Sequence, residues 1–324
     1  MKKVLGLGNA LVDIMTRMEN DSFLSQFDLQ KGSMQLVDKK FSSDVLEKAA
    51  GLQMERASGG SAANTIHGLA RMGVPCGFIG KIGNDDFGRF FGDDMKASGI
   101  KPMLHEGVDE TGRAIALVSK DSERTFATFL GAAVELSASD LKDEEFAGYD
   151  FFHIEGYLVQ NYELIEAAVA LATKHNMMIS LDLASFNVVE QHREFLIKLV
   201  NEYVDIVFAN EDEARAFTGH EPVKALEAIS SMCKLAIVKT GKNGSLVKKG
   251  DARHDILPIT VNCIDTTGAG DLYAAGFLYG LANDRSLDIC GKFGSILAGS
   301  VIEFIGAKIS DDRWEHIRKE IAAL

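Results

Sequence analysis

A glycine-rich turn directly before a long apolar segment is the part of the sequence best suited to chemistry. The turn is Gly268-Ala269-Gly270-Asp271, and the apolar segment that follows it, 272–278, has the character of a buried helix. Backbone N–H groups in the first turn of a helix lack a carbonyl partner within it, so they readily hold an anion. Asp271 could then accept a proton from a hydroxyl group while these N–H groups hold a transferring phosphoryl group. The simpler alternative is a turn in which Asp271 only caps the helix.

A second pair of glycines lies far from the first in the sequence. Gly59 and Gly60 precede Ser61 and Asn64, and a helical pattern begins here and runs to about residue 72. Glycine lets a ligand rich in hydroxyl groups approach the backbone, and an asparagine amide can hydrogen-bond those hydroxyls. We therefore predict that these four residues bind substrate. The alternative is a tight turn in which the helix packs closely against a sheet.

Three further candidates follow predicted strands. Asn9 and Asp13 come after the apolar strand 4–7, and Tyr157 comes after the strand 151–154. In open α/β sheets, ligands bind at the carboxyl ends of the strands. Asp13 is therefore predicted to bind a substrate hydroxyl, and Tyr157 to offer a stacking face. The alternatives are an exposed Asp13 and a Tyr157 packed in the core.

The net charge, the apolar segments and the cysteine spacing exclude several classes of protein. The 324 residues carry a formal net charge of -13, and 46% of them are hydrophobic. This charge argues against a general nucleic-acid binder and against an anionic membrane surface, and no apolar run approaches the ~20 residues that span a bilayer. The four cysteines are widely spaced, which favours a reducing compartment. We expect a cytoplasmic protein with a small-molecule ligand and no nucleic-acid or membrane partner.

The order of the predicted elements indicates the fold class. Strand and helix patterns alternate from residue 151 onward, with predicted strands at 151–154, 178–181 and 205–209 and helices between them. This alternation predicts an α/β fold, a doubly wound and mostly parallel sheet with helices on both faces. Earlier in the chain, two apolar segments within 108–130 flank a polar turn, which predicts a β-hairpin.

The two glycine motifs, in this order, resemble the two signatures of the PfkB (ribokinase-like) family of carbohydrate and nucleoside kinases. The C-terminal match extends over Asp265-Thr266-Thr267-Gly268-Ala269-Gly270-Asp271, with Gly276-Phe277 after it. The resemblance implies that Asp271 is the catalytic base and that Gly268, Ala269 and Gly270 form the anion hole. It also implies a kinase core covered by a small β-lid. We expect the core at 1–14, 38–107 and 131–324, and the lid at 15–37 and 108–130.

The resemblance also implies ATP and Mg²⁺ as cofactors. The spacing N-x-x-E places Asn210 and Glu213 where the family positions phosphate and, indirectly, Mg²⁺; hard oxygen ligands, often through water, suit this ion. A solvated first turn of a helix is the alternative. The expected ATP contacts are Thr240, Gly241 and Gly244 in a glycine-rich turn, and Ser295 and Ala298 near the adenine. A plain hairpin turn is the alternative for the first group.

Two further roles follow from the resemblance. Asp265, Thr267 and Ser310 resemble the monovalent-cation site of some relatives, which makes K⁺ a candidate cofactor and leaves its requirement open. Arg124, at the predicted hairpin, is a candidate contact of the substrate or of the transferred phosphate. A solvated position at the tip of the hairpin is the alternative for Arg124.

The substrate is expected to be a purine nucleoside, adenosine, phosphorylated at its 5′-hydroxyl to AMP. Asn9, within 8–13, lies where the adenosine kinase pattern places a side chain near the purine, and residues 112–133 resemble bacterial adenosine kinase-like members. Apolar segments at 33–36 and 126–130 would suit a flat base. A ribokinase or fructokinase, an inosine or guanosine kinase, and a ligand sensor without catalysis are the alternatives. A monomer or a homodimer is expected.

Overall fold

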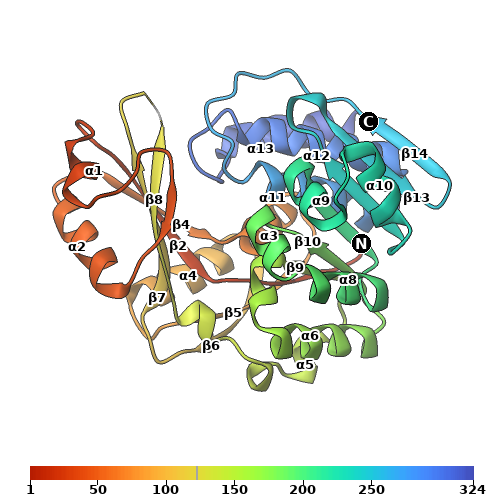
Figure 1. Cartoon of the computed structure of the whole chain (residues 1–324), viewed down its shortest axis with the longest axis horizontal. Helices are drawn as coiled ribbons and strands as arrows, with labels where there is room; N and C mark the ends of the chain where they lie inside the picture. The colour runs from red at the N-terminus through yellow and green to blue at the C-terminus, as the bar shows by residue number, and fades with distance from the viewer. Residues whose placement is uncertain (122) are drawn as a thin grey trace.

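Nine strands form the larger of two β-sheets in the computed structural model, which describes residues 1–121 and 123–324 (Figure 1). In spatial order they are β14 (Ala252–Ile256), β13 (Ser245–Lys249), β12 (Leu235–Lys239), β11 (Ile206–Asn210), β10 (Met178–Asp182), β9 (Phe151–Glu155), β1 (Val4–Leu7), β5 (Cys76–Ile82) and β6 (Ile100–Glu106). The strands from β12 to β6 pair in parallel, and β12–β13–β14 pair antiparallel. The prediction of a mostly parallel α/β sheet is confirmed.

Helices cover both faces of this sheet, and the strands are accordingly apolar on both sides. Successive residues alternate between the two cores: Phe151 packs into one core and Phe152 into the other. One face carries α3 (Ser61–Arg71), α4 (Asp86–Ala97), α11 (Ala269–Ala282), α12 (Leu287–Val301) and α13 (Asp311–Ala322). The other carries α5 (Asp143–Phe146), α6 (Tyr162–Lys174), α7 (Phe186–Gln191), α8 (Arg193–Glu202), α9 (Glu211–Thr218) and α10 (Pro222–Ser230).

Five strands form the smaller sheet, at the left of Figure 1. Their order is β3 (Met34–Leu36), β8 (Arg124–Gly131), β7 (Thr111–Val118), β2 (Leu11–Arg17) and β4 (Met54–Gly59), with α1 (Ser22–Gln26) and α2 (Lys39–Ala49) beside them. The predicted hairpin is confirmed as the antiparallel pair β7–β8. Val45 of α2 packs with Ile115 and Ala127 on one face of this sheet.

The smaller sheet takes in more of the chain than the sequence indicated. We expected 1–14 and 38–107 to lie in the larger domain, but β2 begins at Leu11, and β4 pairs with it along its whole length. The helix α2 also packs on the smaller sheet. The pattern of β4 concealed this, because the polar residues Glu55 and Arg56 interrupt any apolar alternation.

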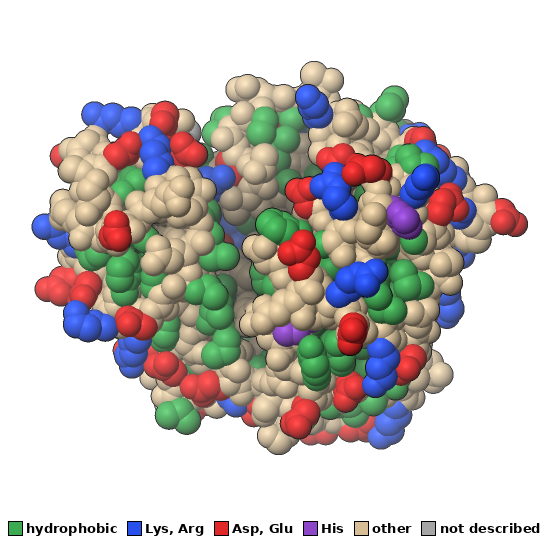
Figure 2. Space-filling view, in the orientation of Figure 1, with side chains coloured by type: hydrophobic (Ala, Val, Ile, Leu, Met, Phe, Trp, Pro, Cys, Tyr) green, Lys and Arg blue, Asp and Glu red, His purple; other side chains and the backbone are tan. Residues whose placement is uncertain are grey.

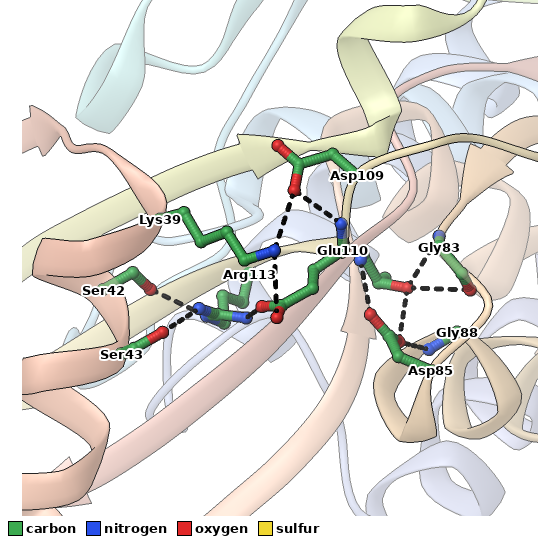
Figure 3. A network of polar contacts seen from close by, with 10 residues as sticks. Lys39, Ser42, Ser43, Gly83, Asp85, Gly88, Asp109, Glu110 and Arg113 are labelled. Carbon is green, nitrogen blue, oxygen red and sulfur yellow. Dashed lines mark hydrogen bonds and ion pairs between the residues drawn. The ribbon is translucent and has the colours of Figure 1, made fainter.

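A polar network fixes the smaller sheet and α2 to the start of α4 (Figure 3). The Arg113 guanidinium donates to Ser42 and Ser43 of α2, at 2.8 and 2.9 Å, and to Glu110 at 2.9 Å. Asp85 accepts hydrogen bonds from the backbone N–H groups of Gly88 and Thr111, so its role is to cap α4. Since Arg113 is 2% exposed, this junction is a buried part of the structure.

Within residues 1–121 and 123–324, no helix has both the length and the apolar character that crossing a bilayer requires.

Candidate active site

Asp271 lies in the first turn of α11, beside backbone N–H groups that face outward from the helix. Gly268 is the N-cap of this helix and has φ of 74°, which favours glycine, and a Cβ on it would lie 2.6 Å from the Cβ of Ala307. The first i→i−4 bond runs from Leu272 N to Gly268 O at 2.8 Å, so the preceding N–H groups have no carbonyl of this helix to bind. Ala269 N donates instead to the Thr266 carbonyl of the preceding turn, at 3.2 Å. The turn Gly268-Ala269-Gly270 therefore has the geometry of an anion site.

The two glycine motifs meet at the Asp271 carboxylate. Ser61 Oγ donates to Asp271 Oδ1 at 2.7 Å, and Asn64 Nδ2 donates to Asp271 Oδ2 at 3.0 Å. Thr65 Oγ1 also donates to the Asp271 carbonyl at 3.1 Å. Burial raises the pKa of Asp271 to about 6, against the lowering effect of the Ser61 and Asn64 hydrogen bonds. A carboxylate with this pKa is ionised near neutral pH yet basic enough to take a proton.

Asp13, on β2, is half-buried and lies near Asp271. Burial raises its pKa to about 6, while Lys308 opposes the shift and Asp271 adds to it. A Cβ on Gly59 would collide with the Asp13 carboxylate, and a Cβ on Gly60, which has φ of 100°, would collide with the Asn9 carbonyl. Both glycines are therefore required for the close approach of β4 to β2 and to the end of β1.

Asn9 is held by a buried glutamate that our sequence reasoning did not identify. Glu155, the last residue of β9, accepts from Asn9 N at 3.0 Å, from Asn9 Nδ2 at 2.6 Å and from Ala62 N at 2.9 Å. Burial raises the pKa of Glu155 to about 7, although these hydrogen bonds lower it. Because the Asn9 amide donates to Glu155, its Oδ1 is left to accept from a ligand.

A second charged cluster lies on the other side of Asp271. Lys239, at the end of β12, donates to Asp182 Oδ2 at 2.8 Å, and Asp182 is the last residue of β10. Burial opposes the charge of Lys239, but Asp182, Glu213 and Asp271 together raise its pKa. Burial also raises the pKa of Glu213 to about 7, with Lys239 opposing.

Of the residues expected at ATP, Asn210 and Thr240 lie beside this second cluster, since Asn210 is opposite Lys239 in the sheet and Thr240 follows Lys239. Asn210 and Glu213 form a capping box at the start of α9: Glu213 N donates to Asn210 Oδ1 at 2.9 Å, and Asn210 N donates to Glu213 Oε2 at 2.7 Å. The turn from Thr240 to Gly244 joins β12 to β13, and a Cβ on Gly244 would collide with the Ile256 carbonyl. Ser295 is buried on α12, where Ala298 is partly buried. Gly241, within the turn, has φ of 52°.

The candidates for a monovalent cation are not gathered around an open site. The Arg124 guanidinium contacts the Asp265 carboxylate and the Thr267 hydroxyl. Asp265 also accepts from Gly306 N at 2.6 Å and from Thr267 N at 2.7 Å. Ser310 instead caps α13, accepting from Arg313 N at 3.4 Å. Arg124 therefore joins the smaller sheet to the loop before α11, rather than lying in solvent at a hairpin tip.

Tyr157 follows β9 in a short 3-10 turn and is half-buried. Its hydroxyl is 3.5 Å from the Ala184 carbonyl, a weak donor contact. Burial raises the pKa of Tyr157 to about 12, and Glu155 and Asp271 add to the shift. The phenol is therefore neutral, and its ring lies near the carboxylates of the site without packing deep in the core.

The site opens between the two sheets. Figure 2 shows the surface hollowed between the lobe with the smaller sheet and the α/β body. A cavity of about 510 Å³ lies between the smaller sheet and the C-terminal loop, lined by Met15, Arg17 and Val118 of the sheet and by Phe304 and Lys308 of the loop. Asp13, Asn64 and Asp271 do not line it, so it adjoins the candidate site through Lys308. Lys308 is shared between this cavity and the surroundings of Asp13, and its Nζ is 3.3 Å from Ser58 Oγ. Burial lowers the pKa of Lys308 to about 8, which Asp94 and Asp13 oppose.

No ready-made cage for a metal ion exists among residues 1–121 and 123–324, where no group of three or more His, Cys, Asp or Glu side chains is placed to hold one. Mg²⁺ is commonly bound through one or two carboxylates, substrate phosphates and water, so it needs no such cage. Glu213, whose carboxylate already accepts from the Asn210 amide, fits that arrangement through water.

Glu155, Asp182, Lys239 and Lys308 belong to the site and were not predicted. Glu155, Asp182 and Lys239 are each the last residue of a parallel strand. The rule that ligands bind at the carboxyl ends of strands could have identified them. Nothing in the sequence around Lys308 indicates that it is buried beside Asp13.

Comparison with known proteins agrees with this geometry. The pattern of the pfkB family carbohydrate kinase matches residues 33–314. A probable sugar kinase from Rhizobium etli CFN 42 has 35% sequence identity and a TM-score of 0.88, over 98% of each chain. An adenosine kinase from Sinorhizobium meliloti has 36% identity and a TM-score of 0.87, over 98% of this chain and 99% of that one. Adenosine kinase 2 from Arabidopsis thaliana is 24% identical over 327 residues, which cover 94% of each chain. Because the family pattern matches residues 33–314, most of the chain, the chain belongs to the pfkB family of carbohydrate kinases.

Proposed function

We propose that this kinase transfers a phosphoryl group from ATP to the 5′-hydroxyl of a purine nucleoside and converts adenosine to AMP. One observation carries the proposal of phosphoryl transfer: the Asp271 carboxylate lies between Ser61 and Asn64 of α3 and the N-terminal turn of α11. This arrangement offers a proton acceptor and an anion site to the same reacting group. Kinases of this family use ATP and Mg²⁺.

The polar atoms around Asp271 suit a ligand with hydroxyl groups. Asn64 is 6% exposed, its Nδ2 donates to Asp271, and its Oδ1 has no partner among residues 1–121 and 123–324. An unpaired buried acceptor is costly unless a ligand donates to it. The Asp13 carboxylate and the Asn9 Oδ1 are further acceptors. Hydroxyl groups of a ribose could donate to all three.

The proposed reaction follows from these positions. Bound ATP with Mg²⁺ supplies the phosphoryl group and part of the charge neutralisation. Asp271 takes the proton of the attacking hydroxyl, and Ser61 and Asn64 hold the carboxylate in place for it. The N–H groups of Gly268, Ala269 and Gly270 stabilise the negative charge that develops on the phosphoryl oxygens.

The smaller sheet supports a nucleoside over a free sugar. Its register places Met34 opposite Phe126, Phe126 opposite Ala116, and Ala116 opposite Met15. Paired residues lie on the same face, so Met34 and Phe126 share a face with Asp13, two residues before Met15 on β2. This face is open to the site, and Met34 and Leu36 are 57% and 60% exposed. A flat base can cover such apolar side chains, whereas a free sugar needs more polar partners.

The remaining predicted site residues are assigned to ATP, to Mg²⁺ and to the substrate. The proposed contacts of ATP are Asn210, Thr240, Gly241, Gly244, Ser295 and Ala298, with Glu213 acting on Mg²⁺ through water. Tyr157 is proposed to face the substrate. Arg124 contacts Asp265 and Thr267, and we propose that it contacts the substrate only after these two contacts break.

A substrate panel tests the proposal directly. We would measure kcat/KM for adenosine, inosine, guanosine, ribose and fructose with ATP and Mg²⁺, and identify each product by chromatography. Adenosine should give the highest kcat/KM and AMP as its product. A free sugar that exceeds every nucleoside would show a sugar kinase instead. Ligand binding without turnover of any acceptor would favour the sensor alternative.

A pair of variants tests the part played by the smaller sheet. Replacing Met34 and Leu36 with Ser should raise KM for adenosine about tenfold, since burying an apolar side chain contributes about 1.5–3 kcal/mol. The KM for any free sugar should hardly change. Val108→Ser is the matched control, because Val108 is an exposed apolar residue outside the strands of this sheet.

A further inference from the structure

One ammonium group lies among three buried carboxylates at the edge of the anion site. Lys239 Nζ is 2.8 Å from Asp182 Oδ2, and Glu213 and Asp271 are close enough to raise its pKa. The side chains of Lys239 and Asp182 are 14% and 6% exposed. Nothing in the family signatures that we matched in the sequence includes either residue.

The ammonium group also faces the anion-binding turn. A Cβ built on Gly270 would lie 3.1 Å from Lys239 Nζ, and it would meet no other atom within 4 Å. The lack of a side chain at Gly270 thus leaves Lys239 and the first turn of α11 facing one common space. A helix N-terminus and an ammonium group that face the same space both attract negative charge.

Stabilisation of the fold alone does not explain why a lysine lies at this position. The strands β10 and β12 are separated by β11, so Lys239 reaches across the end of β11 to find Asp182. Removing two charges from water costs free energy that their attraction does not reliably repay. The local charge is also unbalanced, because Asp182, Glu213 and Asp271 face one lysine. Without Lys239, an incoming polyphosphate would meet the carboxylates of Asp182, Glu213 and Asp271 without the ammonium group that offsets their charge.

We infer that Lys239 binds the polyphosphate of the nucleotide and stabilises the transferring phosphoryl group, with Asp182 as the residue that positions its ammonium group. The inference rests on the proposed phosphoryl transfer but not on the identity of the acceptor. In the transfer, a bond forms between the acceptor oxygen and phosphorus as the bond from phosphorus to the leaving ADP oxygen breaks. The proton of the acceptor hydroxyl goes to Asp271, and Lys239 stays protonated throughout.

Nucleotide binding without an acceptor tests the inference separately from catalysis. Isothermal titration of the full chain with ATP and with ADP, in the presence of Mg²⁺, would compare the wild type with Lys239→Met. We expect Kd for both nucleotides to rise about tenfold or more, since a hydrogen bond to a charged group contributes about 1.5–3 kcal/mol. The Kd of adenosine, titrated alone, should stay within about twofold of the wild-type value.

Kinetics supply the second readout. Loss of one electrostatic contact to a transition state typically lowers kcat about 10²–10³-fold, and we expect this for Lys239→Met. Lys239→Arg keeps the charge and should recover part of both nucleotide affinity and kcat. Lys248→Met is the matched control, because Lys248 lies on the adjacent β13 and pairs with Glu227. Its nucleotide affinity and kcat should equal those of the wild type.

Asp182→Asn separates positioning from binding. The Asn can still accept from Ala184 N, as Asp182 Oδ1 does at 3.0 Å, but it no longer holds the ammonium group by charge. We expect kcat to fall about tenfold, while ADP binds no more weakly than to the wild type, because one repelling carboxylate is gone. If Lys239→Met does not fold, the nucleotide affinity and the kcat of Lys239→Arg and Asp182→Asn test the inference instead.

The outcomes are distinct from those of the substrate panel. Wild-type affinity for ATP and ADP in Lys239→Met, with kcat within threefold, would overturn the inference even if adenosine is phosphorylated. Equal loss of adenosine and nucleotide affinity would also overturn it, since it indicates a structural role. Lys239-dependent binding of ATP in a protein that does not phosphorylate adenosine would support the inference and reject the substrate.

Discussion

Ser61 Oγ donates a hydrogen bond to Asp271 Oδ1 over 2.7 Å, and so joins the first turn of α3 to the first turn of α11. The two residues are 210 positions apart in the sequence. Asn64 holds the other carboxylate oxygen at 3.0 Å. With both oxygens held, the carboxylate has a fixed orientation before any ligand binds, which lowers the reorganisation needed for proton transfer.

Replacing Asp271 with Asn should abolish most of the activity and leave the fold intact. Asn is nearly isosteric, its oxygen can still accept from Asn64, and Ser61 can reverse its hydroxyl to accept. It cannot take a proton from the substrate. We expect kcat to fall about 10²–10⁴-fold, the range for lost general-base catalysis. Steady-state kinetics and circular dichroism would check this; near-full turnover would remove Asp271 from the mechanism.

The same substitution should stabilise the protein at neutral pH. Burial raises the pKa of Asp271 from 3.8 to about 6, so the folded state binds this proton more tightly than the unfolded state does. The favourable contribution is then present in full below pH 3.8 and is lost as pH rises through about 6. A rise in pKa from 3.8 to about 6 corresponds to roughly 3 kcal/mol.

Urea unfolding of the wild type and Asp271→Asn at several pH values measures that difference. The variant should be more stable by up to about 3 kcal/mol at pH 8, and the difference should vanish near pH 4. The acid limb of the wild-type kcat/KM profile should show the same titration near pH 6. A difference in stability that does not depend on pH would contradict the assigned pKa shift.

Arg124 should couple the smaller sheet to the core. Its guanidinium pairs with Asp265, and their side chains are 14% and 1% exposed, so water screens the pair little. Arg124→Met should therefore speed hydrogen exchange of amides in β7 and β8 about tenfold, a loss of about 1.4 kcal/mol. Lys31→Met is the control, since Lys31 pairs with Asp21 and Asp121 on the surface and such pairs contribute little. Equal exchange in Arg124→Met and the wild type would argue against coupling.

The same ion pair bears on the requirement for K⁺. Asp265 already accepts from Arg124, Thr267 N and Gly306 N, and Ser310 caps α13. Because Arg124 supplies positive charge where a cation would bind, replacing K⁺ with tetramethylammonium should change kcat/KM less than about twofold. In Arg124→Met, Asp265 loses its charged partner, and added K⁺ should then increase activity. Strong K⁺ dependence in the wild type would show a cation site that coexists with Arg124.

The sequence predicted those features that local patterns encode. The alternation of strands and helices determined the parallel sheet, and glycines before apolar helices located Ser61, Asn64 and Asp271. The sequence could not predict which distant side chains meet after folding. Lys308 comes beside Asp13, and Arg124 reaches Asp265, only through the placement of the smaller sheet against the C-terminal loop. The strand β4 was missed because its partner β2, not its own pattern, determines its place.

Glu155 offers a test of how the substrate side is positioned. It accepts from Asn9 N, Asn9 Nδ2 and Ala62 N, and therefore holds the end of β1 and the start of α3 in register. In Glu155→Gln, one acceptor oxygen becomes an NH₂ group that faces an N–H donor. Losing a hydrogen bond to a charged group costs about 1.5–3 kcal/mol, so KM for adenosine should rise about 10- to 100-fold.

If Glu155 positions only the substrate side, Glu155→Gln should weaken the binding of adenosine and leave the binding of ATP unchanged. The Kd of ATP should be unchanged, because the Glu155 carboxylate accepts from Asn9 and Ala62, whereas the ammonium group of Lys239 is held by Asp182. Glu145→Gln is the matched control: Glu145 is also poorly exposed, at 12%, and pairs with His105, away from Asn9 and α3. It should keep the wild-type KM. Parallel losses of ATP and adenosine affinity in Glu155→Gln would instead indicate general damage to the fold, and an unchanged KM for adenosine would remove Glu155 from substrate positioning.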